Sequence, residues 1–179
     1  NTTLAENIRK LIDIGIAGIN FEDSHHDEQK LIPIDEQCEK IFLIKKVSTE
    51  MGMPLFINAR TDAYIKSNDL SDEEKLSQTI LRGKAYKDAG ADGLYPIFLK
   101  DKNAISAIVK ETGLPVNILL LPGIPDFNEL KEIGVARLSL GPGLLKVAIN
   151  AMKNIAEKLL NFDGMNDVAQ SPISMNYLK

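Results

Sequence analysis

The chain has 179 residues, 44% of them hydrophobic and 26% charged, which is the composition of one ordinary globular domain. Its net charge of −4 gives no basic surface for nucleic acid, and no stretch approaches the roughly 18 consecutive apolar residues of a membrane span. The single cysteine, Cys38, cannot form an internal disulfide. These features predict a cytoplasmic protein that binds neither nucleic acid nor a membrane.

The first predicted element is a helix over residues 3–13, where apolar side chains recur every three or four positions. The chain has no initial Met and begins directly at Thr2 or Thr3, either of which can cap this helix. We therefore expect the chain to be part of a larger domain.

Strands and helices then alternate along the chain. Predicted strands cover residues 16–21, 55–62, 93–98, 115–121 and 135–140. Predicted helices cover residues 33–49, 71–89, 102–112, 126–133 and 143–160. Two polar connections are expected at 24–32 and 63–70, and the tail over 161–179 is polar and turn-rich. Ser71 and Glu74 have the spacing of a capping box at the start of one helix.

A glycine separates each helix from the strand that follows it. These glycines are Gly15, Gly52, Gly90, Gly113 and Gly134. Glycine adopts the left-handed conformation that ends a helix, and an apolar run begins within two or three residues. Repeated units of this kind predict parallel strands, and their apolar character predicts burial on both faces of the sheet.

Two α/β architectures fit this alternation. One is an open, doubly wound sheet, which would be expected to carry a glycine-rich dinucleotide fingerprint after its first strand, and the sequence has none. The other is a (β/α)8 barrel of the TIM type, which needs about 250 residues. Five strands and a start at a helix favour a barrel of which residues 1–160 supply about the last five βα units, followed by a tail over 161–179.

In either architecture the functional site lies at the carboxyl ends of the strands. The polar residues at these ends are Asn20, Glu22, Asp23, Asn58, Arg60, Asp62, Tyr95, Asn117 and Ser139. The set contains acids, amides and an arginine, and it has no Lys, Cys or His. It therefore argues against Schiff-base and thiol catalysis and favours a metal–carboxylate site that holds an anionic substrate.

The charged members of this set each have a structural alternative. Arg60 either pairs with Glu22 or Asp62, or it binds a carboxylate or phosphonate group of a substrate. Glu22 and Asp23 are candidate ligands of a hard cation, directly or through water. Alternatively, one of them caps the next segment or pairs with Arg60.

Three other features have similar alternatives. The amides of Asn58 and Asn117 can bind substrate oxygens or be satisfied within the barrel. The segment 141–143, Gly-Pro-Gly, resembles a phosphate cradle, but we interpret it as a tight turn because proline has no N–H to offer. The segment 25–27, His-His-Asp, is interpreted as a solvated loop rather than a metal cluster.

Residues 18–23, Gly-Ile-Asn-Phe-Glu-Asp, and 58–63, Asn-Ala-Arg-Thr-Asp-Ala, together resemble the isocitrate lyase / phosphoenolpyruvate mutase superfamily. Segments 89–96, 115–117 and 135–141 support the resemblance, which covers nearly the whole chain. The branch it resembles most is the phosphonomutase-like one, of the carboxyvinyl-carboxyphosphonate phosphorylmutase type.

This resemblance implies a (β/α)8 barrel and an enzyme that makes or breaks a C–C or P–C bond of a small 2-oxo acid or phosphonate through an enolate. It also implies Mg²⁺, or Mn²⁺, as cofactor. By position, Glu22 would hold the metal through water, with Asp23 as a second candidate, and Arg60 and Asn117 would bind the substrate. Glu22, Arg60 and Asn117 form the predicted catalytic set. The predicted substrate site is completed by Asn20, Asn58 and Asp62.

The sequence departs from the lyases of this superfamily in two places. They carry a Lys-Lys-Cys-Gly-His loop after the first of these strands, whereas residues 24–30 here read Ser-His-His-Asp-Glu-Gln-Lys. Ile97 stands where the lyases have an acid. We therefore expect a mutase, a hydrolase of an oxaloacetate-like acid or a lyase with other chemistry, and not an isocitrate or methylisocitrate lyase. His25 and His26 are hypothetical acid–base groups of the loop.

The aspartates that bind the metal directly in this superfamily lie on strands before the first helix of this chain. We therefore expect residues 1–179 alone to be inactive. The alternative function is a non-catalytic or degenerate barrel domain with a binding or structural role. An incomplete barrel leaves sheet edges open, so a homo-oligomer is expected. We interpret Ile173, Met175, Tyr177 and Leu178 as the remnant of a helix exchanged between subunits.

Overall fold

The computed structural model describes residues 2–25, 27–28 and 30–170. The chain divides into two compact units, Asn1–Ser139 and Leu140–Lys179. The division expected at residue 160, between barrel and tail, stays a prediction.

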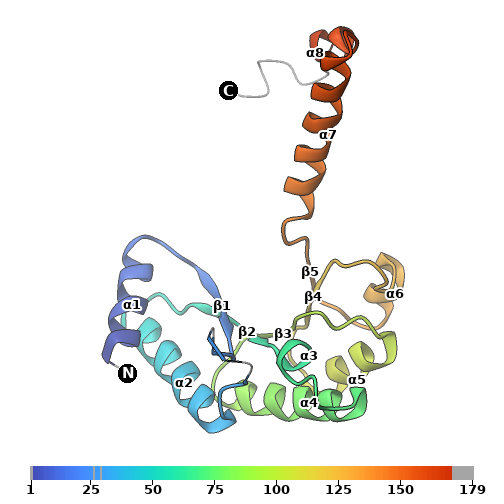
Figure 1. Ribbon diagram of the computed structural model, residues 1–179. Helices are drawn as coiled ribbons and strands as arrows, with labels where there is room; N and C mark the ends of the chain where they lie inside the picture. The colour runs from blue at the N-terminus through green and yellow to red at the C-terminus, as the bar shows by residue number, and fades with distance from the viewer. Residues whose placement is uncertain (1, 26, 29, 171–179) are drawn as a thin grey trace. The chain divides into compact units, whose positions relative to one another are not determined.

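The first unit alternates helices with strands (Figure 1). Its helices are α1 (Thr2–Asp13), α2 (Ile34–Glu50), α3 (Ala63–Lys66), α4 (Asp72–Asp88), α5 (Lys102–Thr112) and α6 (Phe127–Glu132). Its strands are β1 (Gly18–Glu22), β2 (Phe56–Thr61), β3 (Gly93–Pro96), β4 (Asn117–Leu119) and β5 (Arg137–Ser139). Each predicted strand is present, and each is shorter than the apolar run that predicted it.

All of these strands run parallel, in the order of the sequence. β1, β2 and β3 form one sheet, and β4 pairs with β5. A parallel bridge between Leu94 and Val116 continues the order from β3 to β4, and the Leu94 N–H donates to the Pro115 carbonyl at 2.9 Å. This is an α/β fold of successive βα units, as predicted.

The local signals at the helix ends are confirmed. Gly15, Gly52, Gly90, Gly113 and Gly134 all have positive φ, between 59° and 106°. The capping box at the start of α4 is present, because the Ser71 hydroxyl accepts from the Glu74 N–H and the Glu74 carboxylate accepts from the Ser71 N–H. These features depend on short-range chemistry, which explains why the sequence predicted them correctly.

The core lies between the strands and helices α1, α2, α4 and α5 (Figure 1). Its fully buried side chains include Ile41, Ile44, Ile57, Leu94, Ile105, Ile108 and Ile118. Gly83 allows α4 to pack closely, because a Cβ there would lie 2.7 Å from both Leu94 Cδ2 and Thr112 Cγ2. The core therefore holds the strands from their helix side.

The opposite face of the strands is more polar. Burial on both faces holds for β3, in which every residue is buried, but the expectation is wrong for β1, whose residues are exposed or half-buried. In β2, Ile57 and Ala59 are fully buried against the helices, whereas Phe56, the first residue of the strand, is 45% exposed. In β1, Gly18 and Asn20 are exposed. Apolar residues alternate with polar ones here, and the polar ones define the inner face of the barrel.

Two connections contain more structure than expected. The link over 63–70 begins with α3, which follows β2 directly. In the loop over 24–32, Ser24 forms an antiparallel bridge with Leu31. β3 ends at Pro96, two residues earlier than predicted, and Phe98 beyond it has φ of 66°, an uncommon conformation for a side chain of this size.

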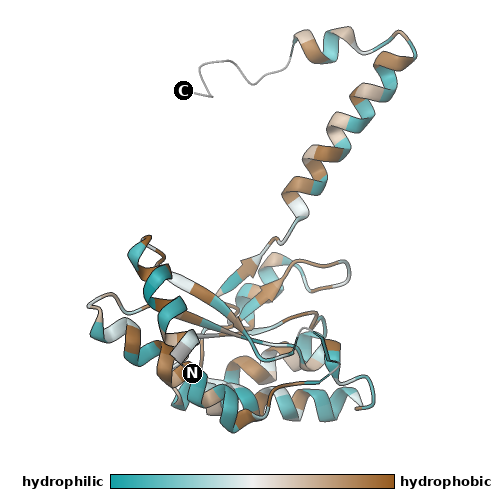
Figure 2. Ribbon diagram, turned by 60° about the vertical axis from the view of Figure 1, so that its left-hand side comes forward, coloured by the Kyte–Doolittle hydropathy of each residue, from teal (hydrophilic) through white to brown (hydrophobic). Residues whose placement is uncertain are grey.

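The second unit consists of α7 (Gly143–Leu160) and α8 (Met165–Ala169). Gly141 has φ of 53° and the Gly143 N–H donates to the Leu140 carbonyl at 3.0 Å, which makes this segment the tight turn that was predicted. α8 corrects the expectation of an irregular tail. Many residues of α7 are hydrophobic (Figure 2), and the side chains of Leu144, Leu145 and Met152 among them are exposed. The expected swapped-helix remnant, Ile173 to Leu178, lies outside the described residues.

Within the part of the chain that the structure describes, no helix is long and apolar enough to span a membrane.

Candidate functional site at the strand ends

Four inner-face residues lie side by side in one row across neighbouring strands, from Glu22 at the end of β1 to Asn117 at the start of β4. Glu22 pairs in register with Arg60, and Arg60 with Tyr95. One residue beyond the bridge of Leu94 with Val116, Asn117 follows Tyr95 in the same row. The structure thus brings the predicted catalytic set of Glu22, Arg60 and Asn117 onto one face, and adds Tyr95 between its last two members.

The guanidinium of Arg60 is held by two carboxylates. Its Nε donates to Asp62 Oδ1 at 2.7 Å and its Nη2 to Asp62 Oδ2 at 3.2 Å. Its Nη1 lies 3.0 Å from Glu22 Oε2. Both structural pairings that the sequence left open are therefore present. Two of the five N–H groups of the guanidinium remain for a ligand.

Ser24 closes this arrangement into a ring. Its hydroxyl oxygen lies 2.8 Å from Asp62 Oδ2 and within hydrogen-bond reach of Glu22 Oε1, and its single proton can be donated to only one of these carboxylates at a time. Ser24 is 9% exposed and Asp62 is 1% exposed, whereas the side chains of Glu22 and Arg60 keep about a quarter of their surface exposed. One cation and two carboxylates give the ring a formal charge of −1, which favours a cation nearby before an anion can bind.

Asp23 points the other way, into a buried network between β1 and α4. Its Oδ2 accepts from Arg82 Nη1 at 3.2 Å and from the Tyr86 hydroxyl at 2.7 Å, and its Oδ1 accepts from the Asp62 N–H at 2.9 Å. Burial raises the pKa of Tyr86, and the charge of Asp23 raises it further. Because both oxygens of Asp23 are engaged, we leave it out of the proposed metal site and assign it a structural role.

The asparagines occupy two levels of the inner face. Asn58 Nδ2 donates to Asn20 Oδ1 at 2.8 Å, one level below the row, beside a hollow of about 310 Å³ that also contacts Arg137. Asn117 is 1% exposed and its Oδ1 accepts from the Ser139 hydroxyl at 3.0 Å. Its Nδ2 is buried and has no partner among the described residues. A buried amide donor of this kind can serve a ligand oxygen.

Tyr95 is 6% exposed and lies next to Arg60. Burial raises the pKa of its phenol, while the positive charge of Arg60 opposes that shift. A hydrogen bond with the Ser139 side chain also opposes the rise in the pKa of Tyr95.

The described residues do not by themselves make a metal centre. They contain no group of three His, Cys, Asp or Glu side chains that could hold an ion. Only Glu22 among the predicted ligands faces the inner side with part of its surface exposed. A hard cation such as Mg²⁺ needs about six oxygen ligands, so Glu22 can contribute one contact, directly or through water, to a site completed elsewhere.

The described residues of the loop after Ser24 are mostly exposed. His25 and Asp27 are exposed, which fits the interpretation of a solvated loop. His26 lies outside the described residues. Lys66 on α3 donates to the Glu28 carbonyl at 3.1 Å and connects the loop to that helix. Cys38 on α2 is half-buried, and burial raises the pKa of its thiol.

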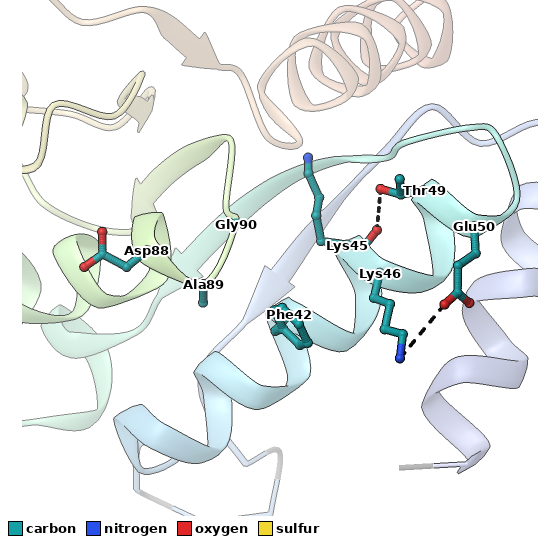
Figure 3. A pocket seen from close by; sticks show the side chains of 8 residues that line it. All are labelled: Phe42, Lys45, Lys46, Thr49, Glu50, Asp88, Ala89 and Gly90. Carbon is teal, nitrogen blue, oxygen red and sulfur yellow. Dashed lines mark hydrogen bonds and ion pairs between the residues drawn. The ribbon is translucent and has the colours of Figure 1, made fainter.

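A separate hollow of about 450 Å³ lies on the helical side, between α2 and the end of α4 (Figure 3). Phe42 lines it, with 62% of its surface exposed, and Lys46 reaches toward Glu50 at 4.0 Å along its edge. None of the predicted site residues lines this hollow, and it lies away from the strand ends.

Sequence reasoning missed Ser24, Arg82 and Tyr86. Ser24 directly follows Glu22 and Asp23, which was the available signal, but it read as the first residue of a polar loop. Arg82 and Tyr86 are four residues apart and so share one face of α4. Nothing local distinguishes that face from a solvated one.

Parallel βα units in sequence order define the chain as part of a barrel of the TIM type. The model of the phosphoenolpyruvate phosphomutase family matches residues 1–160, and the chain belongs to that family. The family lies in the phosphoenolpyruvate mutase / isocitrate lyase superfamily of lyases and mutases, as the resemblance predicted.

Three relatives illustrate the similarity. An uncharacterised protein of Mycobacterium tuberculosis is 33% identical over 164 residues, which cover 92% of this chain and 57% of the relative. The 2-methylisocitrate lyase of Bacillus subtilis is 29% identical, covering 70% of this chain and 39% of that enzyme. A crystal structure from Burkholderia cenocepacia J2315, assigned as a phosphonomutase, matches with a TM-score of 0.79 and 35% identity over 86% of this chain and 62% of that one. The chain thus spans less than two thirds of the length of each relative.

Proposed function

We propose that the natural protein, in its full length, is a Mg²⁺-dependent lyase or mutase. It makes or breaks a C–C or P–C bond of a small 2-oxo acid or phosphonate through an enolate. The observation that carries this proposal is the row of Glu22, Arg60, Tyr95 and Asn117 on the inner face, in a chain of the phosphoenolpyruvate phosphomutase family. Support from relatives is limited to the part of their length that the chain matches.

In this proposal Arg60 binds a carboxylate or phosphonate group with its two remaining N–H groups, while Asp62 keeps the guanidinium fixed. Asn117 donates its unpartnered amide to another substrate oxygen. The pair of Asn58 and Asn20 forms the floor below the row. Fixed donors of this kind orient the substrate and stabilise negative charge that develops on it.

Glu22 is the residue that we assign to the metal, through a bound water. A divalent cation at this point would supply positive charge that stabilises an enolate, and it would change the local charge from −1 to +1, which favours an anionic substrate. Water, substrate oxygens and residues other than those described would supply the remaining ligands, and Mn²⁺ fits the same oxygen ligands.

The alternative is a non-catalytic barrel domain. The observation in its favour is that Glu22 and Asp62 already neutralise Arg60, as they would in a purely structural cluster. The two functions differ in whether the protein removes a proton from the substrate carbon next to the carbonyl group.

Exchange of the methyl protons of pyruvate with deuterium in heavy water, followed by proton NMR, tests the proposal. We expect the full-length protein with Mg²⁺ to accelerate the exchange, and its Arg60→Ala variant to lose that acceleration. The same reaction mixtures should be screened for turnover of oxaloacetate and of phosphonopyruvate. A full-length protein that catalyses neither exchange nor turnover would support the non-catalytic alternative.

A further inference from the structure

The ring around Arg60 contains one residue to which neither the family resemblance nor the strand-end rule gives a role. Ser24 lies just beyond the carboxyl end of β1, and its hydroxyl reaches the carboxylates of both Glu22 and Asp62. Because the hydroxyl has one proton, the two carboxylates share a single donor, which partly offsets their mutual repulsion.

The backbone of Ser24 is fixed from several sides. Ser24 pairs with Leu31 across the loop, and the Ile32 N–H donates to the Asp23 carbonyl at 2.8 Å. Arg82 Nη1 donates to the Ile32 carbonyl at 2.9 Å and also reaches the Asp23 carboxylate. A buried side chain whose backbone is held by these hydrogen bonds has little freedom to turn away.

Asp62 and Glu22 contact Arg60 in different ways. Asp62 holds the guanidinium of Arg60 by a two-point contact, and so sets its plane. Glu22 touches Arg60 through Oε2 alone, and its other oxygen is held only by Ser24. The orientation of the Glu22 carboxylate is therefore set by Ser24 as much as by Arg60.

We propose that Ser24 is a positioning residue, which rests on the function proposed above. Its hydroxyl links Glu22 to Asp62 and holds the Glu22 carboxylate at the edge of the guanidinium. In that orientation two N–H groups of Arg60 stay open for an anion, and the exposed quarter of Glu22 faces the side from which a cation arrives. Without the hydroxyl, Glu22 is free to turn onto the remaining N–H groups and block them.

The test uses the full-length protein and its variants Ser24→Ala and Ser24→Thr. Oxalate, which resembles the enolate of a 2-oxo acid, is titrated in the presence of Mg²⁺ by calorimetry. Ser24→Ala is expected to weaken oxalate binding roughly tenfold or more, the effect of losing a hydrogen bond to a charged group. Ser24→Thr keeps the hydroxyl and is expected to bind within about threefold of the natural protein.

Ser77→Ala is the matched control, because Ser77 is exposed on α4 and donates only to the Glu73 carbonyl. It should leave oxalate affinity unchanged. A Ser24→Ala variant that binds oxalate like the natural protein would overturn the proposal. So would a threonine variant as weak as the alanine variant, because the hydroxyl would then not be the operative group.

A second measurement separates this inference from the proposed function. The variants Ser24→Ala, Glu22→Gln and their combination are unfolded with urea. If Ser24 holds Glu22, the effects of the two substitutions on stability are not additive. The unfolding equilibrium constant of the double variant should then be smaller, by roughly fivefold or more, than the value that the two single effects predict together. If the natural protein does not bind oxalate, the proposed function is refuted. The unfolding measurements still test whether Ser24 holds Glu22. Additive effects in that cycle would refute the link between Ser24 and Glu22 whether or not oxalate binds.

Discussion

The buried pair of Asp23 and Arg82 makes a quantitative prediction about stability. Asp23 is fully buried, and the side chain of Arg82 is 7% exposed. Replacing Arg82 with methionine removes the cation and its bonds to Asp23, Ile32 and Tyr86, while the carboxylate stays buried. Removing one partner of a buried ion pair lowers the free energy of unfolding by about 3–5 kcal/mol, and we expect Arg82→Met to fall in that range.

The donors that remain on Asp23 refine this number. The Tyr86 hydroxyl and the Asp62 N–H still contact the carboxylate, so the loss should lie toward the lower end of the range. Adding Asp23→Asn to Arg82→Met removes the unpaired charge, and the double variant should recover part of the stability. The matched control is Arg9→Met, since Arg9 is exposed on α1, and it should change the free energy of unfolding by less than about 0.5 kcal/mol.

Urea unfolding of the full-length protein, followed by circular dichroism and extrapolated linearly to water, measures these values. The reasoning is refuted if Arg82→Met lowers the free energy of unfolding by less than about 1 kcal/mol. It is also refuted if the double variant is less stable than Arg82→Met alone, because the unpaired carboxylate would then not be the cause.

Three further predictions concern packing, pH and the ligand. Gly83→Ala places a methyl group 2.7 Å from Leu94 and Thr112 and should lower the free energy of unfolding by about 1–3 kcal/mol in urea; no loss would mean that α4 can move away. Burial, with the charges of Asp72 and Asp101, raises the pKa of Tyr64 to about 12, so the unfolded chain ionises first and stability falls between about pH 10 and pH 12. Tyr64→Phe should flatten that fall in urea midpoints, and an unchanged pH slope would contradict the shift. Asn117→Ala should weaken oxalate binding roughly tenfold, whereas Asn103→Ala on the exposed face of α5 should not; equal affinities would remove Asn117 from the substrate site.

The parts of the fold that the sequence predicted depend on local chemistry. The glycines that end helices and the capping box of Ser71 with Glu74 act within a few residues, so their patterns are readable without the fold. The parallel order of the strands followed from the repetition of these units. Except for β1, which ends at Glu22, the strands were predicted to end too late, because an apolar run such as 115–121 continues beyond the residues that pair.

The parts of the site that the sequence did not predict depend on long-range contacts. Arg82 lies 59 positions after Asp23, and only the packing of α4 against the sheet, at β2 and β3, brings them together. Glu22 and Asp23 point in opposite directions because successive side chains of an extended chain alternate between the two faces. Which of the two faces the helices depends on the register with β2. The roles proposed for the site residues and the expected homo-oligomer stay predictions.

The measurement that tests the central claim most directly is oxalate binding to the full-length protein, with and without Mg²⁺, in its natural form and as Arg60→Lys. Lysine keeps the charge but cannot make the two-point contacts of a guanidinium. The account predicts that Mg²⁺ strengthens binding, that Arg60→Lys weakens it roughly ten- to hundredfold, and that residues 1–179 alone bind weakly. Equal affinity of the natural protein and Arg60→Lys, or binding that Mg²⁺ does not change, would contradict it.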